Sequence, residues 1–328
     1  MNNIIQTKIY DLTGYSLSER YGTYGGNSGS KECILIGNDH WIIKYPHNSA
    51  NLNKGGSLSC SASSLSEYIG SHVFSLLGYN VHDTILGIRR GKLVVACKDF
   101  CMDDDRLIEY RQLRNTYCEE AKNALAKRVY VTKNRHLSNL YEIEAHLEHN
   151  PLLRGLEGIK QHFWETAVID GLINNNDRSN DSWGIIRNDK RTVIAPIYSN
   201  AGSFSPEESD SKLQDRLSNE LIMIDSINRD VTSYSMDGEH CLLYKEFLLL
   251  DNKDLHEAII KVVPKIQENI GQIHAFIEFI PEEYAGIEVI SKVRKKEYIS
   301  EMDARIKWLL DPQYKNVLQR TKKHDDTI

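Results

Sequence analysis

The chain has 328 residues, of which 41% are hydrophobic and 26% are charged, as in a folded globular protein of one large domain or two closely packed ones. The net charge of −6 argues against direct binding of nucleic acid, which requires a basic surface. No run of 18 apolar residues and no signal-peptide pattern occurs, so we expect a cytoplasmic protein without membrane contact, unless a specialised system that uses no signal peptide secretes it.

The first hundred residues are predicted to form mainly β-strands with one helix. Apolar segments at 33–36 and 41–45 flank Gly37-Asn38-Asp39, a signal for a hairpin turn. Apolar residues then recur at helical spacing over 65–77, and Gly78 ends that helix. The segments 84–87 and 93–97 are predicted to form a second hairpin, because Arg90-Gly91 lies between them.

From about residue 102 the pattern changes to helices. Charged amphipathic segments predict helices at 103–128 and 138–148, and a more apolar one predicts a buried helix at 159–173. Two short strands follow, at 183–187 and 192–197, and the chain beyond 211 is predicted to be mostly helical. We therefore expect an α+β fold with a β-rich N-lobe, 1–101, and a helical C-lobe, 102–328. A cleft between two unlike lobes is a common ligand site.

The six cysteines include no CxxC pair, and no pair of histidines has the spacing of a zinc finger. We interpret them as reduced thiols, and their spacing predicts no zinc site.

Three features of the first part of the chain are candidates for holding phosphate groups. The Gly- and Ser-rich segment 24–31 precedes a strand, and it either cradles phosphate with its backbone N–H groups or is an ordinary turn. Lys44 lies in an apolar strand and points either to solvent or into a cleft. Glu67 lies on the following helix, where a glutamate is usually exposed unless it pairs with a lysine such as Lys44.

Two polar segments follow the buried helix. The segment 174–184 contains Asp177 and is either an ordinary loop or a catalytic loop. It is not an EF-hand loop, because no Gly and no Glu stand at the required positions after Asp177. A second polar turn, 198–203, follows the next two strands. Glycine-rich turn, strand lysine, helix glutamate, aspartate loop and second polar turn occur in this order in protein kinases.

With these motifs the chain resembles the HipA-like Ser/Thr kinases, in particular their compact single-chain type. The resemblance covers about residues 25–204. It rests on YGGNSGSK (24–31), WIIKYP (41–46), SEY (66–68), LVVACKDF (93–100), NDRSNDSWG (176–184) and APIY (195–198). It implies a two-lobed protein-kinase-like fold and transfer of the γ-phosphate of ATP to a Ser or Thr hydroxyl.

The resemblance also implies roles for individual residues. Lys44 would hold the α- and β-phosphates while paired with Glu67, and Asp177 would be the catalytic base for the acceptor hydroxyl. The segment 96–98 would be the hinge that binds adenine through its backbone. Ser28 or Ser30 would be an autophosphorylation site. The residues expected to contact the nucleotide are Gly25, Gly26, Ser28, Gly29, Lys44, Ala96 and Lys98.

The chain departs from the kinase pattern at both metal-ligand positions. The asparagine expected five residues after Asp177 is Ser182, and the aspartate expected after Tyr198 is Ser199. A serine hydroxyl is a weak ligand for Mg²⁺. Three explanations are open: Asn200, Asn180 or Asp181 takes over the Mg²⁺ or Mn²⁺; the chain is a pseudokinase that binds nucleotide; or it is an inactivated variant of an active kinase.

The sequence does not identify a protein substrate. Because HipA-like proteins often pair with a small DNA-binding antitoxin, the resemblance implies an antitoxin-like partner. A Ser/His/Asp hydrolase is not predicted, because no GxSxG motif occurs.

Overall fold

A computed structural model of the chain describes residues 7–20, 31–46, 61–102, 104–126 and 137–325. Two compact units can be distinguished. The first contains Met1–Phe100, Asn200–Asp225 and Ile266–Ala304, and the second contains Cys101–Ser199, Ser226–Lys265 and Arg305–Ile328. Each unit is therefore built from several chain segments. This grouping does not test the expected lobe boundary after residue 101, which stays a prediction.

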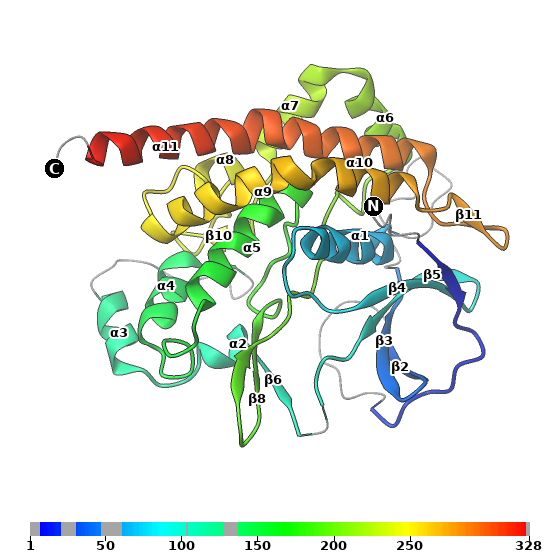
Figure 1. The fold of residues 1–328 in the computed structure, drawn as a ribbon, viewed down its shortest axis with the longest axis horizontal. Helices are drawn as coiled ribbons and strands as arrows, with labels where there is room; N and C mark the ends of the chain where they lie inside the picture. The colour runs from blue at the N-terminus through cyan, green and yellow to red at the C-terminus, as the bar shows by residue number, and fades with distance from the viewer. Residues whose placement is uncertain (1–6, 21–30, 47–60, 103, 127–136, 326–328) are drawn as a thin grey trace. The chain divides into compact units, whose positions relative to one another are not determined.

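The first unit contains a five-stranded sheet in the order β1-β4-β5-β3-β2 (Figure 1). Both predicted hairpins are present. In the first, Ile36 pairs with Asp39 across a turn containing Gly37; in the second, Arg89 pairs with Lys92. The strands are β1 (Ile9–Asp11), β2 (Lys31–Ile36), β3 (Asp39–Lys44), β4 (Thr84–Arg89) and β5 (Lys92–Lys98).

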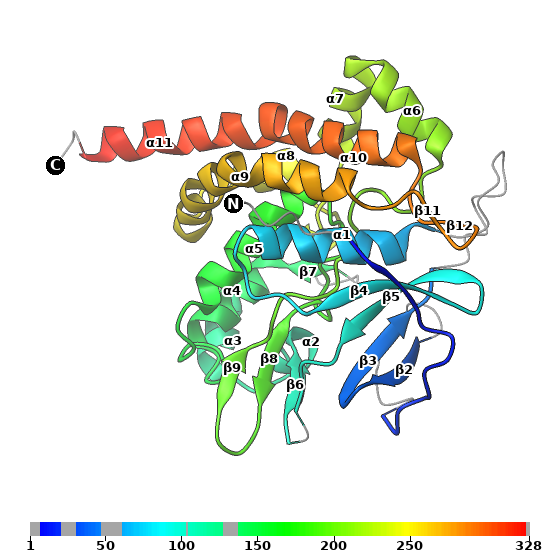
Figure 2. The same ribbon diagram turned by 45° about the vertical axis from the view of Figure 1, so that its right-hand side comes forward.

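Helix α1 (Ser63–Leu76) lies along this sheet and contacts β4 and β5 (Figure 2). Its apolar residues Ile69, Val73 and Phe74 are fully buried. The helical spacing of apolar residues in the sequence thus marks the side of the helix that faces the core. The helix ends just before Gly78, whose positive φ of 74° suits a glycine after a helix C-terminus. The prediction of this helix is confirmed.

Later parts of the chain complete the first unit. The aromatic ring of Phe276 stacks on His72 of α1, and Phe204 stacks on Tyr298. These contacts join segments that are far apart in the sequence. The elements are α6 (Asp210–Ser218), the beginning of α7 (Glu220–Arg229), the end of α9 (Lys253–Glu278), β11 (Glu283–Tyr284), β12 (Ile287–Glu288) and nearly all of α10 (Lys292–Arg305).

The second unit is mostly helical around α5 (Ile159–Ile173), which is buried over most of its length. Burial on nearly all sides is typical of a helix in the core of a unit. The second unit also contains a three-stranded sheet, β6-β8-β9, and a parallel pair of strands, β10-β7. Its other elements are β6 (Arg106–Glu109), α2 (Tyr110–Leu113), α3 (Glu119–Ala126), β7 (Ser138–Asn139), α4 (Leu140–His149), β8 (Gly184–Arg187), β9 (Thr192–Ile194), β10 (Tyr234–Ser235), α8 (Tyr244–Phe247), the π-helix η1 (Ile306–Leu310) and α11 (Asp311–Asp325).

The predicted helix at 103–128 is wrong over its first part. Arg106–Glu109 forms strand β6 and pairs with β8, so backbone pairing with a distant segment overrides the local helical pattern. Gly184 of β8 makes this pairing possible, since a Cβ atom there would lie 2.2 Å from the carbonyl oxygen of Ile108. The next helix begins at Leu140 rather than at residue 138, because the Asn139 side chain caps it by accepting a hydrogen bond from the backbone N–H of Glu142.

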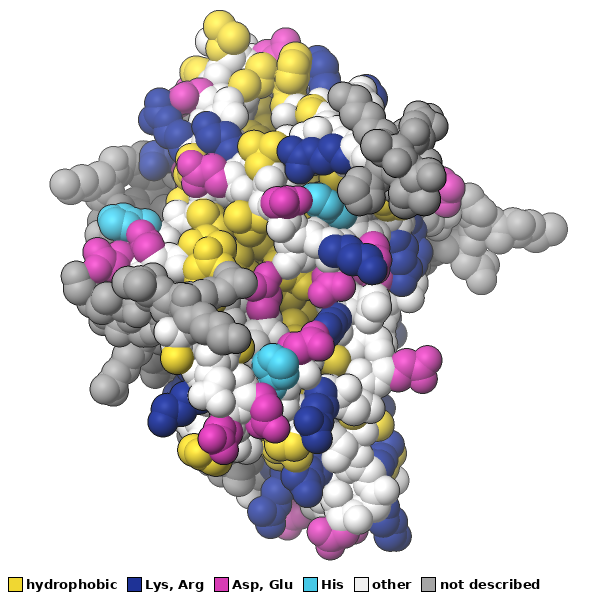
Figure 3. Space-filling model, turned by 90° about the vertical axis from the view of Figure 1, so that its left-hand side faces the viewer, with side chains coloured by type: hydrophobic (Ala, Val, Ile, Leu, Met, Phe, Trp, Pro, Cys, Tyr) yellow, Lys and Arg dark blue, Asp and Glu magenta, His cyan; other side chains and the backbone are white. Residues whose placement is uncertain are grey.

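The helices and the surface charges bear on the predicted absence of membrane and nucleic-acid contacts. Among the described residues, none of the helices combines the length and apolar character that a bilayer-spanning segment requires. On the face shown in Figure 3, basic side chains are interspersed with acidic ones. The prediction that no nucleic acid is bound directly stays a prediction.

Candidate active site

An ion pair between Lys44 and Glu67 lies in the first unit. Lys44 is the last residue of β3, and its Nζ lies 2.8 Å from Oε2 of Glu67 on α1. The Glu67 side chain is completely buried, whereas 24% of the Lys44 side chain is exposed. Burial alone would raise the pKa of Glu67, but Lys44 and His82 outweigh it and hold this pKa well below its usual value. Glu67 is therefore a buried carboxylate that stays ionised.

The other carboxylate oxygen of Glu67 has two further partners. His82 Nε2 lies 3.1 Å from Oε1, and the backbone N–H of Asn200 donates a hydrogen bond to the same atom at 3.1 Å. The Ser71 hydroxyl joins this network, because it lies 3.0 Å from His82 Nε2 and accepts a hydrogen bond from Asn200 Nδ2 at 3.0 Å. Neither His82 nor Ser71 was predicted from the sequence to be a site residue. Ser71 could have been found, since it lies one helical turn after Glu67.

The two expected hinge residues lie within the central strand of the sheet. Ala96 pairs with Ile43 of β3 on one side and with Ile85 of β4 on the other. The backbone N–H of Lys98 donates to the carbonyl oxygen of Asp83. The predicted contacts of Ala96 and Lys98 with adenine therefore compete with bonds of the sheet. The other predicted nucleotide and autophosphorylation residues, Gly25, Gly26, Ser28, Gly29 and Ser30, lie outside the described residues.

In the second unit, Asp177 is an exposed residue of the largely buried loop that follows α5. Its backbone N–H donates to Oδ1 of Asn175, and its carbonyl oxygen accepts a hydrogen bond from the Ser182 hydroxyl at 3.0 Å. The buried Tyr244 hydroxyl donates to the carbonyl oxygen of Asn175 at 2.7 Å. The backbone around Asp177 is thus held in place while its side chain faces solvent.

The next residue, Arg178, ties this loop to its surroundings. Its guanidinium forms two hydrogen bonds of 2.8 Å with the carboxylate of Asp170 on α5, and both side chains are buried. The same guanidinium donates to the carbonyl oxygens of Ser182 and Tyr198. Arg178 therefore connects α5, the Asp177 loop and the segment that precedes Ser199.

The two predicted metal-ligand positions contact each other. The hydroxyl oxygens of Ser182 and Ser199 lie 3.2 Å apart. The backbone of Ser199 has a positive φ of 66°, a region in which Asp and Asn occur more often than Ser. The two segments are therefore arranged so that side chains at both positions meet, but the groups that meet are neutral hydroxyls.

The three candidate replacements do not supply a suitable ligand set. The Asn200 side chain is buried and bonded to Ser71. The Asp181 carboxylate lies 2.7 Å from Arg111 Nε. Asn180 has a buried amide oxygen without a hydrogen-bond partner in the described part of the chain. Two hydroxyls and one amide lack the carboxylate that Mg²⁺ and Mn²⁺ prefer, so these positions do not fit the expected metal.

Comparison with known proteins identifies similar kinases. The sequence matches none of the family models. The curated Ser/Thr-protein kinase CtkA of Helicobacter pylori (strain J99) is 28% identical over 323 residues, which is 96% of this chain and 90% of the relative. The crystal structure of the H. pylori proinflammatory kinase CtkA matches with a TM-score of 0.81 and 25% identity, covering 95% of this chain and 98% of that one.

A more distant solved structure shares the fold. HipA of Shewanella oneidensis MR-1, in a complex of a toxin–antitoxin system with HipB and operator DNA, matches with a TM-score of 0.53 and 12% identity. The match covers 90% of this chain and 69% of that chain. The expected resemblance to the HipA-like Ser/Thr kinases and the expected kinase-like α+β fold are thereby confirmed. The chain is kinase-like in both sequence and fold.

Proposed function

We propose that the chain is an ATP-dependent Ser/Thr protein kinase. The observation that carries this proposal is the 2.8 Å ion pair between Lys44 and the buried Glu67. A lysine held in this way presents a fixed positive charge, as kinases require for the α- and β-phosphates of ATP. The similarity to a Ser/Thr-protein kinase over 96% of the chain supports the same activity.

In the proposed reaction, Asp177 accepts the proton of the Ser or Thr hydroxyl of the substrate. The hydroxyl oxygen then forms a bond to the γ-phosphorus while the bond between this phosphorus and the bridging oxygen of ADP breaks. The exposed side chain of Asp177 suits this role, since a protein substrate must reach it. Arg178 and Tyr244 contribute by holding the loop backbone in one conformation.

The adenine ring is expected to contact the backbone of the segment 96–98 in β5. Ala96 has a strand on either side, and the N–H of Lys98 is bonded to the carbonyl oxygen of Asp83. The N–H of the next residue, Asp99, is likewise bonded to the carbonyl oxygen of His40, so adenine binding here would replace bonds of the sheet. Kinases in general use ATP with a divalent metal ion, but the hydroxyls of Ser182 and Ser199 are weak ligands for such an ion.

The proposal is tested by intact-mass measurement of the purified chain after incubation with ATP and either Mg²⁺ or Mn²⁺. A general protein substrate is included to detect transfer to another chain. The control variant is Asp177→Asn, which keeps the volume of the side chain but removes its basicity. A phosphate gained by the wild type and not by this variant is expected. No transfer with either metal would contradict the proposed kinase activity.

A nucleotide-binding pseudokinase is the second candidate function. The paired hydroxyls of Ser182 and Ser199 favour it, because they replace the groups that neutralise the triphosphate charge in active kinases. Calorimetric titration with ATP distinguishes the two. A pseudokinase is expected to bind ATP equally well with Mg²⁺ and with EDTA and to transfer no phosphate. Loss of ATP binding in EDTA would contradict this alternative.

The partners of the chain are a further proposal. A structural neighbour is a HipA protein recorded with HipB in a toxin–antitoxin system, and we propose a small antitoxin-like protein as the partner of this chain. Growth arrest upon expression, relieved by a small gene beside its own, is the expected result. Expression without any effect on growth would argue against it.

A further inference from the structure

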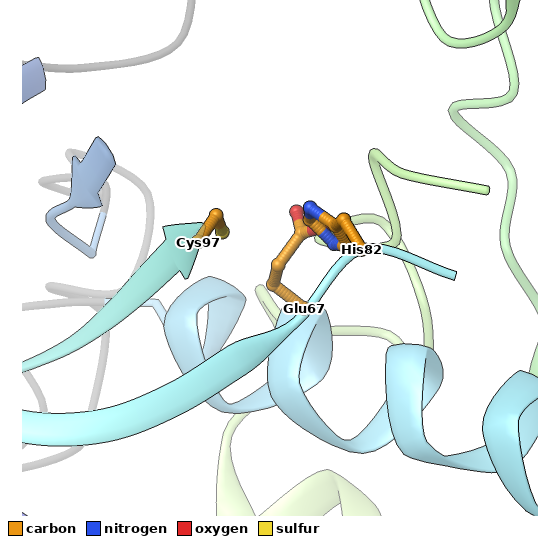
Figure 4. Close-up of side chains that lie close together, drawn as sticks. All are labelled: Glu67, His82 and Cys97. Atoms are coloured by element: carbon orange, nitrogen blue, oxygen red, sulfur yellow. The ribbon is translucent and has the colours of Figure 1, made fainter. Parts of the chain in front are cut away.

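Three side chains of the types that bind zinc meet beneath the sheet of the first unit. Glu67 comes from α1, His82 from the segment before β4, and Cys97 from β5 (Figure 4). Their ligand atoms all lie within 4.8 Å of one another, and all three side chains are buried. The residues are far apart in the sequence, so the folded sheet and helix bring them together.

We propose that Glu67, His82 and Cys97 form a binding site for Zn²⁺ or a similarly soft divalent ion. A carboxylate oxygen, an imidazole nitrogen and a thiolate are all common zinc ligands. Zinc–ligand bonds of about 2.0–2.3 Å place tetrahedral ligands roughly 3.3–3.8 Å apart. The present separations are therefore close to those required, and a small inward movement of the side chains closes the site around the ion. A water molecule or a further ligand would take the fourth position.

The environment of Cys97 is an independent observation in favour of this site. Its side chain is only 2% exposed, and its thiol forms no hydrogen bond within the described part of the chain. The proposed kinase reaction does not use this thiol. Burial raises the pKa of Cys97 to about 12, so the thiol keeps its proton until a metal ion displaces it. Binding therefore releases one proton from sulfur to solvent.

The Ser71 hydroxyl lies beside the proposed site. It is 3.0 Å from Nε2 of His82, the nitrogen that faces Glu67. When Nε2 binds the ion, it can no longer share a hydrogen bond with Ser71, and the freed hydroxyl is available to a metal-bound water. A hard ion such as Mg²⁺ prefers oxygen ligands and coordinates thiolate poorly. The site is therefore expected to select zinc over magnesium.

Charge balance indicates what happens to Lys44. A Zn²⁺ ion is neutralised by the carboxylate of Glu67 and the thiolate of Cys97, so Lys44 loses its counter-charge. Because Lys44 is partly exposed, it can turn toward solvent. Bound zinc is thus expected to separate Lys44 from Glu67. If the proposed kinase function holds, zinc inhibits phosphate transfer; the metal site itself does not depend on that function.

The binding test uses the full chain without nucleotide, in competition with a chromophoric zinc chelator and with excess Mg²⁺. One equivalent of Zn²⁺ is expected to bind. Cys97→Ser and His82→Gln are each expected to lower the affinity at least about tenfold, since each removes one ligand. The matched control is Cys33→Ser, which alters another buried cysteine of the same sheet. An affinity unchanged in Cys97→Ser, or lowered equally in Cys33→Ser, would overturn the site.

A second measurement covers the case in which a variant does not fold. Cobalt(II) added to the wild-type chain is expected to give a thiolate-to-metal charge-transfer absorption in the near ultraviolet. Its absence from the wild-type spectrum would also overturn the site. Neither measurement uses phosphate transfer, so a failure of the proposed kinase function remains distinguishable from a failure of the zinc site.

Discussion

The carboxylate of Glu67 joins the lysine of β3 to the residue that follows Ser199: Oε2 contacts Lys44 Nζ at 2.8 Å, and Oε1 accepts the backbone N–H of Asn200 at 3.1 Å. One buried group thus fixes two parts of the first unit. A change at Glu67 is therefore expected to affect both the orientation of Lys44 and the conformation of the chain at Asn200.

Replacing Glu67 by glutamine tests this double role. The amide can still accept a bond from Asn200, but it leaves Lys44 without its counter-charge. We expect stability to fall by about 1–3 kcal/mol and any phosphate transfer to fall by about a hundredfold or more. Urea denaturation and initial transfer rates measure the two effects.

The control is Glu257→Gln, which breaks an exposed pair with Lys253 and is expected to change stability by less than about 0.5 kcal/mol. Equal stability of Glu67→Gln and the wild type would contradict the role of Glu67.

Restoring the expected metal ligands is a gain-of-function test. In the double variant Ser182→Asn, Ser199→Asp, a carboxylate and an amide replace the two hydroxyls, and the positive φ of Ser199 accommodates aspartate. We expect Mg²⁺ to strengthen ATP binding by about tenfold or more in this variant, and much less in the wild type. Calorimetry with and without Mg²⁺ measures the difference.

The control for this restoration is Ser179→Asp, which adds a negative charge in the same loop, beside Ser182, but at neither ligand position. It is expected to leave the Mg²⁺ dependence unchanged. If the double variant binds ATP without any effect of Mg²⁺, then Ser182 and Ser199 are not the degenerate metal positions.

The buried His146 predicts a loss of stability in mild acid. Burial, and then the charge of Arg114, lowers the pKa of His146 to about 4, and Asn150 Nδ2 donates to its Nδ1, which favours the neutral ring. The unfolded value is about 6.5, so the unfolded chain binds more protons between these values. This contribution to stability is complete above pH 6.5 and is lost as the pH falls toward 4.

The resulting fall in the free energy of unfolding is about 1.6 kcal/mol between pH 6.5 and pH 5. Urea denaturation at a series of pH values is expected to show it in the wild type. The variant His146→Gln has no titrating ring at this position, so the same fall should be smaller by that amount. Parallel curves for the two proteins would show that His146 does not titrate in this range.

Gly184 and Gly271 are a matched pair for testing the β6–β8 contact. A Cβ at Gly184 would meet the backbone of Ile108, whereas one at Gly271 in α9 would meet nothing within 4 Å. Gly184→Ala is expected to destabilise the fold by about 3 kcal/mol or more. Gly271→Ala is expected to stabilise it by about 0.5–1 kcal/mol, because alanine favours helix. Thermal denaturation of both variants gives the comparison, and a tolerated Gly184→Ala would argue against the close strand pairing.

Local sequence patterns predicted the elements whose contacts are also local. The two hairpins and the helix carrying Glu67 could be predicted because turn residues and apolar spacing lie within a few residues of each other. The pairing of Lys44 with Glu67 was expected only because their order along the chain matches that of a kinase. Strand β6 was missed because its partner, β8, lies far along the chain, and local patterns do not encode such pairing.

The neighbours of Glu67 could not be predicted from local sequence patterns either. His82 and Cys97 reach Glu67 from separate elements, so no sequence spacing could identify them as neighbours. The cysteine spacing predicted no zinc site, and the proposed site uses only one cysteine. The side-chain orientation at Asn200 was equally beyond prediction, because it depends on Ser71 of α1.

The buried pair of Arg178 and Asp170 also bears on the thermodynamics of binding. It holds the loop around Asp177 through contacts within the chain itself, so a ligand that contacts this loop need not first order it. The conformational entropy lost upon binding there should be small. The accompanying change in heat capacity should then reflect the apolar surface that the ligand covers, without a contribution from coupled folding.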